Sequence, residues 1–108
     1  MNNDTIFALS SAPGKSGVAV IRISGNDLLK LFKRIINKKK FESRHAYFTN
    51  LKDNNGDLID QCIAIYFNAP YSFTGEDIIE IHSHGSPAVI NKIFEFLRDD
   101  KLDDLQVL

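Results

Sequence analysis

YSFTGEDIIEIHSHG, the stretch Tyr71–Gly85, contains the pattern that decides the fold of this chain. From Asp77 to His84, β-branched residues alternate with polar ones, and this period of two predicts a strand with one buried face. The loop before it brings an aromatic ring, a hydroxyl, a glycine and two carboxylates within the six residues Ser72–Asp77. Such a composition is typical of a binding loop, but a short turn capped by Thr74 or Glu76 would account for it equally well.

Similar patterns on both sides of this strand predict an α+β domain. Further strands are expected at Thr5–Leu9, Val18–Ile23, Arg44–Leu51 and Leu58–Phe67, and the polar turn at residues 53–57 should join the last two into an antiparallel hairpin. The end of the chain barely begins one more strand. The order β-β-α-β-β-β-α-(β) indicates a mixed β-sheet covered by two main helices.

Each predicted helix has an identifiable start and an apolar side. Asn26 is placed to cap the first helix, and Pro87 suits the first turn of the second, which continues through Ala88–Arg98. The apolar positions are Leu28, Leu29, Leu31, Phe32, Ile35 and Ile36 in the first helix and Val89, Ile90, Ile93, Phe94 and Leu97 in the second.

Length and composition indicate one globular domain that covers residues 1–108. The chain is 44% hydrophobic and 25% charged, which is enough for one core. A domain of this size hides a small share of its surface, so a cofactor site shared with a second subunit would be physically reasonable. The apolar ending Leu105–Leu108 favours a fragment of a longer protein over a natural terminus.

The charge balance predicts no strong direct binding of nucleic acid by this chain. The formal net charge is −1, whereas such binding needs clustered Lys and Arg side chains that neutralise many phosphates. One dense basic stretch ends the first predicted helix, where cations complement the helix dipole, and an RNA-binding patch is the less favoured alternative. This stretch contains Lys30, Lys33, Arg34, Lys38, Lys39 and Lys40.

Cysteine content and the first residues favour a cytoplasmic protein without a membrane partner. Cys62 is the only cysteine, so no disulfide can form within the chain, and its apolar neighbours favour a packing role over a nucleophilic one. Residues 1–11 lack the basic start and the apolar stretch of a signal peptide, and no apolar run reaches membrane-spanning length.

Gly14-Lys15-Ser16 resembles the end of a phosphate-binding P-loop but does not complete one. The first glycine of that motif would fall at Leu9, and the residues after Ser16 are strand-like, whereas phosphate capture needs the positive end of a helix. We therefore expect a glycine-rich loop between strands, and no hydrolysis of GTP by this chain.

Glu80, His82 and His84 share one face of the predicted strand, while Ile79 and Ile81 project from the other. A carboxylate with two histidines could hold zinc or iron, but a polar sheet face, or hydrogen bonds that fix neighbouring loops, would give the same pattern. No metal site is assigned.

Arg22 interrupts an apolar strand, and its side chain is expected on the same face as those of Val18, Val20 and Ser24. A guanidinium group in this position requires a planar anion. Either a glutamate within the chain or the glutamate tail of a ligand could supply that anion. In the loop before Asp77, carboxylates could accept paired N–H donors from an amino-pyrimidine, and Gly75 would permit close approach of the backbone.

Two blocks in this order, PGKSGVAVIRISG at Pro13–Gly25 and APYSFTGEDIIEIHSHGSP at Ala69–Pro87, closely resemble the N-terminal domain of the MnmE/TrmE family of tRNA-modification GTPases. The resemblance extends from Asp4 to Leu97. It implies a dimer-forming domain that binds a 5-formyl-tetrahydrofolate type cofactor as one-carbon donor, with a fold related to the folate-binding part of the glycine cleavage T-protein.

The resemblance also implies the setting in which this domain acts. The family's full protein, with a GidA/MnmG-type flavoprotein partner, modifies the wobble uridine of certain tRNAs at carbon 5, and its GTPase domain binds GTP, Mg and K outside the present chain. The block that follows in the family, similar to EPGEFTKRAFLNGK, is not part of this sequence.

On this basis we expect a folate pocket near a homodimer interface and assign no catalytic residue. A stand-alone folate-dependent enzyme of the aminomethyltransferase kind and a purely structural dimerisation module are the alternatives. The residues expected to line or support the pocket are Arg22, Ser24, Thr74, Gly75, Glu76, Glu80, His82 and His84.

Overall fold

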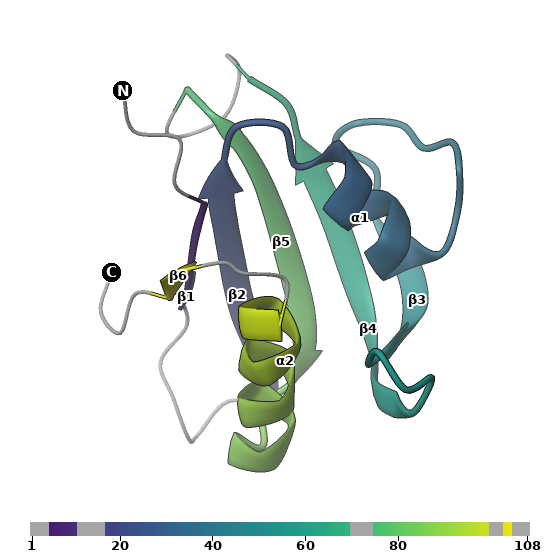
Figure 1. The fold of residues 1–108 in the computed structure, drawn as a ribbon, viewed down its shortest axis with the longest axis vertical. Helices are drawn as coiled ribbons and strands as arrows, with labels where there is room; N and C mark the ends of the chain where they lie inside the picture. The colour runs from purple at the N-terminus through teal and green to yellow at the C-terminus, as the bar shows by residue number, and fades with distance from the viewer. Residues whose placement is uncertain (1–4, 11–16, 70–74, 100–102, 105–108) are drawn as a thin grey trace.

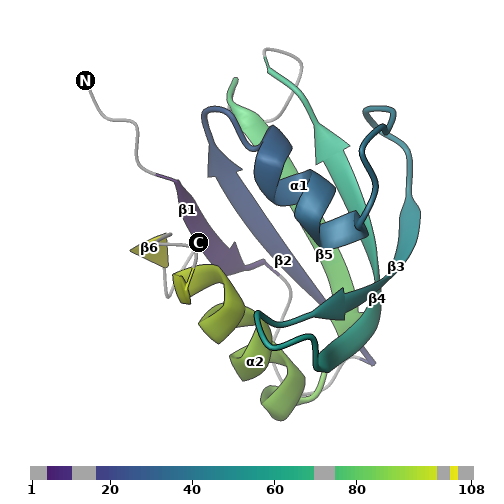
Figure 2. The same cartoon turned by 45° about the vertical axis from the view of Figure 1, so that its right-hand side comes forward.

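A six-stranded sheet with both helices on one of its faces makes up the domain (Figures 1 and 2). The computed structural model describes residues 5–10, 17–69, 75–99 and 103–104. The strands are β1 (Ile6–Leu9), β2 (Val18–Gly25), β3 (Tyr47–Lys52), β4 (Leu58–Phe67), β5 (Asp77–His84) and β6 (Asp103–Asp104), and the helices are α1 (Leu29–Ile36) and α2 (Pro87–Asp99).

The strand order across the sheet is β3-β4-β5-β2-β1-β6. All neighbours pair antiparallel except β1 and β6, which are parallel, so the predicted mixed sheet and the predicted order of elements are confirmed. β5 lies between β2 and β4, and its residue Glu80 is opposite Arg22 on one side and Ile65 on the other.

Alternation along the central strands separates an apolar face from a polar one. Ile21, Ile23, Ile79 and Ile81 are completely buried and lie in the core cluster. Figures 1 and 2 show α1 and α2 over the same side of the sheet. Val18, Val20, Arg22 and Ser24, which alternate with the buried residues of β2, therefore lie on the opposite face. We call this the open face because none of the described helices covers it.

The helices cover the apolar face with residues spaced three and four apart. Leu31, Phe32, Ile35 and Ile36 are buried in α1, as are Ile90, Ile93, Phe96 and Leu97 in α2. Phe32 is the centre of an aromatic cluster, with ring centroids 4.7 Å from Phe41 and 5.4 Å from Tyr66. The edge-to-face geometry of the Phe32–Phe41 pair is favourable for aromatic rings.

The predicted end of β2 at Ile23 is wrong, since the strand continues through Gly25. Two predicted starts, those of α1 and β3, are also wrong, and both lie next to residues in the left-handed conformation. Asn26 does not cap α1: the N-cap is Leu28, and it makes no side-chain capping bond. Asp27 has φ 59°, so the chain turns there and buries Leu28 before the helix begins. Likewise, Arg44 has φ 62°, and β3 begins only at Tyr47.

No helix among the described residues is long and apolar enough to cross a membrane. The P-loop-like residues 14–16 lie outside the described part of the chain.

Replacing Phe32→Ala should lower the free energy of unfolding by about 3–5 kcal/mol, because it leaves a cavity beside the rings of Phe41, Tyr47 and Tyr66. Urea unfolding followed by circular dichroism measures this change. Leu29→Ala is the matched control in the same helix, since Leu29 is 44% exposed, and it should change the free energy by less than about 0.5 kcal/mol. Equal losses in the two variants would contradict the assigned position of Phe32 in the core.

Candidate functional site

A row of charged side chains lies on the open face where β2 and β5 pair. The Nε of Arg22 donates to Oε2 of Glu80 at 2.9 Å, and Nε2 of His82 lies 3.0 Å from Oε1 of the same carboxylate. The Glu80 side chain is only 10% exposed, whereas that of Arg22 is 40% exposed. Of the two anions considered for Arg22, the glutamate within the chain is therefore observed.

Glu80 stays ionised despite its position in the sheet. Burial works against the charge and is the largest single influence, but hydrogen bonds from His82 and Arg22, together with their positive charge, outweigh it and lower the pKa of Glu80. The result is an oriented carboxylate with one partner on each oxygen.

Ser24 and Glu76 extend this row toward the loop that enters β5. The Ser24 hydroxyl donates to Oε1 of Glu76 at 3.2 Å. Gly75, just before it, has φ 79°, a left-handed conformation in which a side chain would be strained. Of the loop residues predicted from sequence, Glu76 is thus bonded to β2, Gly75 supplies the left-handed turn before it, and Thr74 lies outside the described residues.

His84 does not join the Glu80 group. Its Nδ1 lies 2.8 Å from Oδ1 of Asp60, and its backbone N–H donates to Oδ2 of the same residue at 2.9 Å. The Asp60 side chain is 10% exposed and connects β4 to the end of β5. Within the described part of the chain, no group of three His, Cys, Asp or Glu residues is arranged to hold a metal ion.

Asp77, which the sequence offered only as one of the two carboxylates of the loop Ser72–Asp77, holds the connection between β4 and β5. Its Oδ2 accepts a hydrogen bond from the Tyr66 hydroxyl, and its Oδ1 accepts one from the backbone N–H of Ala69 at 2.8 Å. Burial, and then the interaction with Asp77, raise the pKa of Tyr66 well above its ordinary value. One carboxylate therefore joins the two ends of the connection between β4 and β5, and the position of Asp77 beside Glu76 was the available signal in the sequence.

A hollow of about 320 Å³ opens on the same face, at the His82 end of the row. Three exposed apolar side chains surround it: Val18 (49% exposed), Phe48 (70%) and Ile63 (39%). The complete lining is Gly17, Val18, Phe48, Gln61, Cys62, Ile63, His82, Ser83 and His84. Of the predicted site residues, His82 and His84 line this hollow, whereas the Arg22, Ser24, Glu76 and Glu80 groups lie beyond it along the strands.

Cys62 borders this hollow but is not a reactive thiol. Burial, followed by the negative charge of Asp60, raises the pKa of Cys62 to about 12, so the nucleophilic thiolate is not formed near neutral pH. The packing role expected from the sequence agrees with its 2% exposure.

Replacing Glu80→Gln should make the stability of the fold less dependent on pH in acid. Because the folded pKa of Glu80 lies below the ordinary value of 4.5, the unfolded chain binds more protons in this range, and stability rises with pH. The stabilisation is complete above the ordinary pKa and disappears as the pH falls through the folded pKa. Urea titrations at several pH values between about 3 and 7 measure this slope.

The exposed Glu95 on α2 supplies the control, since Glu95→Gln should keep the wild-type dependence on pH. The assigned role of Glu80 fails if Glu80→Gln loses stability in acid as steeply as the wild-type chain does.

Comparison with known proteins identifies the family. The family model described as "GTP-binding protein TrmE N-terminus" matches residues 5–103. The chain is 58% identical over 95 residues to the tRNA modification GTPase MnmE of Wolbachia pipientis subsp. Culex pipiens (strain wPip), covering 88% of this chain and 22% of that protein. It is 48% identical over 90 residues to the MnmE of Nitrosomonas eutropha, covering 83% and 20%.

The MnmE of Helicobacter acinonychis is 45% identical over 93 residues, which cover 86% of this chain and 20% of that protein. The chain thus spans about a fifth of the length of the curated relatives it matches. The match of the family model over almost the whole chain, together with these identities, shows that the chain belongs to the TrmE N-terminal family and corresponds to the N-terminal domain of a tRNA modification GTPase of the MnmE type.

Proposed function

We propose that the open face binds a reduced folate of the 5-formyl-tetrahydrofolate type, beside the loop that enters β5. The observation that carries this proposal is the polar row that runs from Ser24 and Glu76 to Arg22, Glu80 and His82 on a sheet face without a described helix over it. The amino-pyrimidine part of a folate presents paired N–H donors, for which an ionised carboxylate is the natural acceptor. Glu76 and Glu80 supply carboxylates in this row.

The neighbours of these carboxylates have positioning roles. Arg22 and His82 each hold one oxygen of Glu80, and Ser24 holds Glu76, so the acceptors are oriented before a ligand arrives. Oriented polar groups bind more tightly because less conformational freedom is lost on binding. Thr74 and Gly75 belong to the same proposed site as parts of the loop, and His84, held by Asp60, borders the adjacent hollow.

The proposed site is completed by a second copy of the chain. Val18, Phe48 and Ile63 leave an apolar surface next to the polar row, and apolar surface that a small domain cannot bury by itself favours association. A homodimer across the open face would exclude water from the folate site. The proposed relation of the fold to the folate-binding part of the glycine cleavage T-protein is consistent with a ligand on this face.

In the longer protein, the bound folate would donate the one-carbon unit for modification of the tRNA wobble uridine at carbon 5. We assign GTP, Mg and K to the GTPase domain, and the contact with a GidA/MnmG-type flavoprotein to the full-length protein. The proposed location is the cytoplasm. This chain contributes ligand binding and assembly, and no catalytic step is assigned to it.

Calorimetric titration with 5-formyltetrahydrofolate should show saturable binding to this chain, and tighter binding to a version extended by about twenty residues, enough for one further strand and loop. Glu76→Gln should weaken binding about tenfold or more, because a hydrogen bond to a charged acceptor is worth roughly 1.5–3 kcal/mol.

Glu95→Gln on α2 removes the same charge from an exposed position away from the site and should bind like the wild-type chain. Absence of binding heat from both the chain and its extended version would refute the folate proposal. A Glu76→Gln variant that binds normally would exclude this residue from the site.

Sedimentation equilibrium should show a reversible dimer that the double substitution Phe48→Ser with Ile63→Ser weakens by tenfold or more, since each buried apolar side chain contributes on the order of 1.5–3 kcal/mol. Leu58→Ser is the control: Leu58 is 54% exposed and lies away from the hollow on the open face, in the lining of another hollow that includes Lys92 and Glu95 of α2. The dimer interface lies elsewhere if the Leu58 variant dissociates as readily as the double variant.

A further inference from the structure

The charged residues of α1 and of the turn that follows it are all basic. Between Leu28 and Phe41 the sequence contains six Lys or Arg residues and no Asp or Glu, although the whole chain has 13 basic and 14 acidic residues. The six are Lys30, Lys33, Arg34, Lys38, Lys39 and Lys40. This segment is therefore a local positive region in a chain whose net charge is −1.

The fold exposes all six: Lys30 in the first turn of α1, Lys33 and Arg34 in its last turn, and Lys38–Lys40 in the turn that follows. Leu31, Phe32, Ile35 and Ile36 of α1 are buried in the core, which leaves the basic residues on the solvent side. Asn37 then adopts a left-handed conformation (φ 54°, ψ 46°), and the backbone N–H of Lys38 donates to the carbonyl of Lys33 at 3.2 Å. This turn brings Lys38–Lys40 back beside the last turn of the helix.

The helix dipole accounts for only part of this charge. The C-terminal end of a helix is equivalent to about half a negative elementary charge, whereas five cations lie in the last turn of α1 and just after it: Lys33, Arg34, Lys38, Lys39 and Lys40. Among the described residues, no carboxylate forms an ion pair with Lys33, Lys38, Lys39 or Lys40. Crowded like charges repel one another, so an anionic partner would stabilise this surface.

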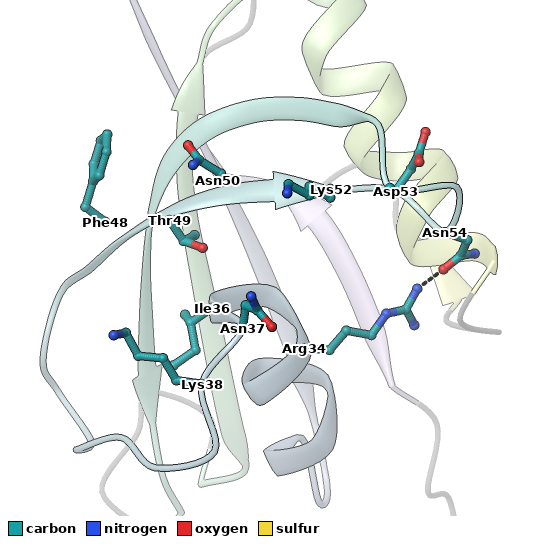
Figure 3. A pocket seen from close by; sticks show the side chains of 11 residues that line it. Arg34, Ile36, Asn37, Lys38, Phe48, Thr49, Asn50, Lys52, Asp53 and Asn54 are labelled. Carbon is teal, nitrogen blue, oxygen red and sulfur yellow. Dashed lines mark hydrogen bonds between the residues drawn. The ribbon is translucent and has the colours of Figure 1, made fainter.

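A hollow of about 560 Å³ lies between the end of α1 and strand β3 (Figure 3). Lys38 borders it from the turn after α1, Lys52 and Asn50 from β3, and Asn37 from the helix end. The one carboxylate in its lining is Asp53, whose Oδ1 already accepts two backbone N–H groups of its own turn. The hollow is therefore lined chiefly by ammonium and amide donors.

Arg34 has a fixed orientation beside this hollow. Its guanidinium group donates to Oδ1 of Asn54 across the gap (Figure 3) and stacks on the ring of Phe96, 4.8 Å from the centroid. A second hollow, of about 470 Å³, is bordered by Lys33, Lys39 and Lys40 together with Ser43 and Asn68. Positive and amide groups are thus available in two hollows that share the basic segment.

We propose that this basic surface contacts successive phosphates of an RNA backbone. Lys, Arg and Asn side chains are the groups that proteins use against phosphate oxygens, and such contacts position a nucleic acid without reading its sequence. Two separate hollows suit a chain of repeated phosphates better than one small anion. The choice of tRNA as the RNA rests on the proposed function, but the basic surface shares only Phe48 with the hollow on the open face and none of the residues of the polar row.

The contact is weak by itself and adds to binding by the rest of the longer protein. With a net charge of −1, the chain has no general field to hold RNA, so the expectation of no strong binding by this chain alone still applies. A weak contact of this kind orients an RNA that other domains hold.

The experiment measures binding of a fluorescent unmodified tRNA transcript to this chain by anisotropy, from 20 to 200 mM KCl. The wild-type chain should bind saturably at 20 mM, with affinity that falls as salt rises. Lys38→Gln with Lys52→Gln should weaken binding and reduce the slope of log affinity against log salt by about 2, one for each lost phosphate contact. The double variant should lose affinity for random-sequence RNA to the same extent, because phosphates carry no sequence information.

Lys92→Gln with Arg98→Gln on α2 is the control with the same change in charge, and it should leave the slope within about 0.5 of wild type if the effect is local. The proposal is overturned if the wild-type chain shows no saturable binding of tRNA at 20 mM KCl. It is also overturned if the control variant loses as much affinity for tRNA as the Lys38→Gln, Lys52→Gln variant. Binding of poly-glutamate in place of RNA would overturn it in favour of an acidic protein partner. Calorimetry with 5-formyltetrahydrofolate should be unchanged in both variants, so failure of the RNA contact and failure of folate binding give different results.

Discussion

Strand β5 pairs with β2 on one side and β4 on the other, and this double pairing is the constraint on which the rest of the molecule depends. It places Glu80 opposite Arg22 and Ile65, and His82 opposite Val20 and Ile63. Side chains alternate along a strand, so a shift of one residue would move Glu80 into the core and Ile79 into solvent. The burial of Ile79 and Ile81 under the helices therefore fixes the register, and the register fixes which polar groups meet on the open face.

Burial of Glu80 makes its partners necessary. A carboxylate withdrawn from water is stable in the charged form only when hydrogen bonds and positive charges replace the lost hydration. Arg22 and His82 do so from the same face, one on each oxygen. The polar row is consequently organised by the fold itself, which suits a site that must present acceptors in fixed positions.

The edge strand β3 connects the two surfaces for which we propose ligands. Its residue Phe48 borders the hollow on the open face and also the hollow at the end of α1. The first surface combines paired charges with exposed apolar side chains, whereas the second is basic and rich in amides. These different chemistries favour different partners, a folate with a second subunit on one surface and a phosphate chain on the other.

Local patterns predicted much of the fold. The period of two in β5 predicted that Glu80 and His82 would share a face opposite Ile79 and Ile81, and the apolar spacing predicted Phe32 and Ile35 in the core; both predictions are confirmed. The errors occurred where the backbone leaves regular geometry, since Asp27 and Arg44 adopt positive φ values without being glycine. Positive φ is uncommon for residues other than glycine, and although Asp adopts it more often than most, propensity does not say at which position it occurs.

The sequence by itself determined the family, through the two blocks that resemble it. It also determined the order of strands and helices and the common face of Glu80 and His82, because these depend on local composition and alternation. Only the tertiary structure decided which polar side chains form hydrogen bonds with one another. Arg22 meets Glu80 across 58 positions of sequence, His84 meets Asp60 and not Glu80, and Asp77 joins Tyr66 to Ala69. Such pairs follow from strand order and register, which are set by burial of the whole apolar face under two helices and not by any short segment.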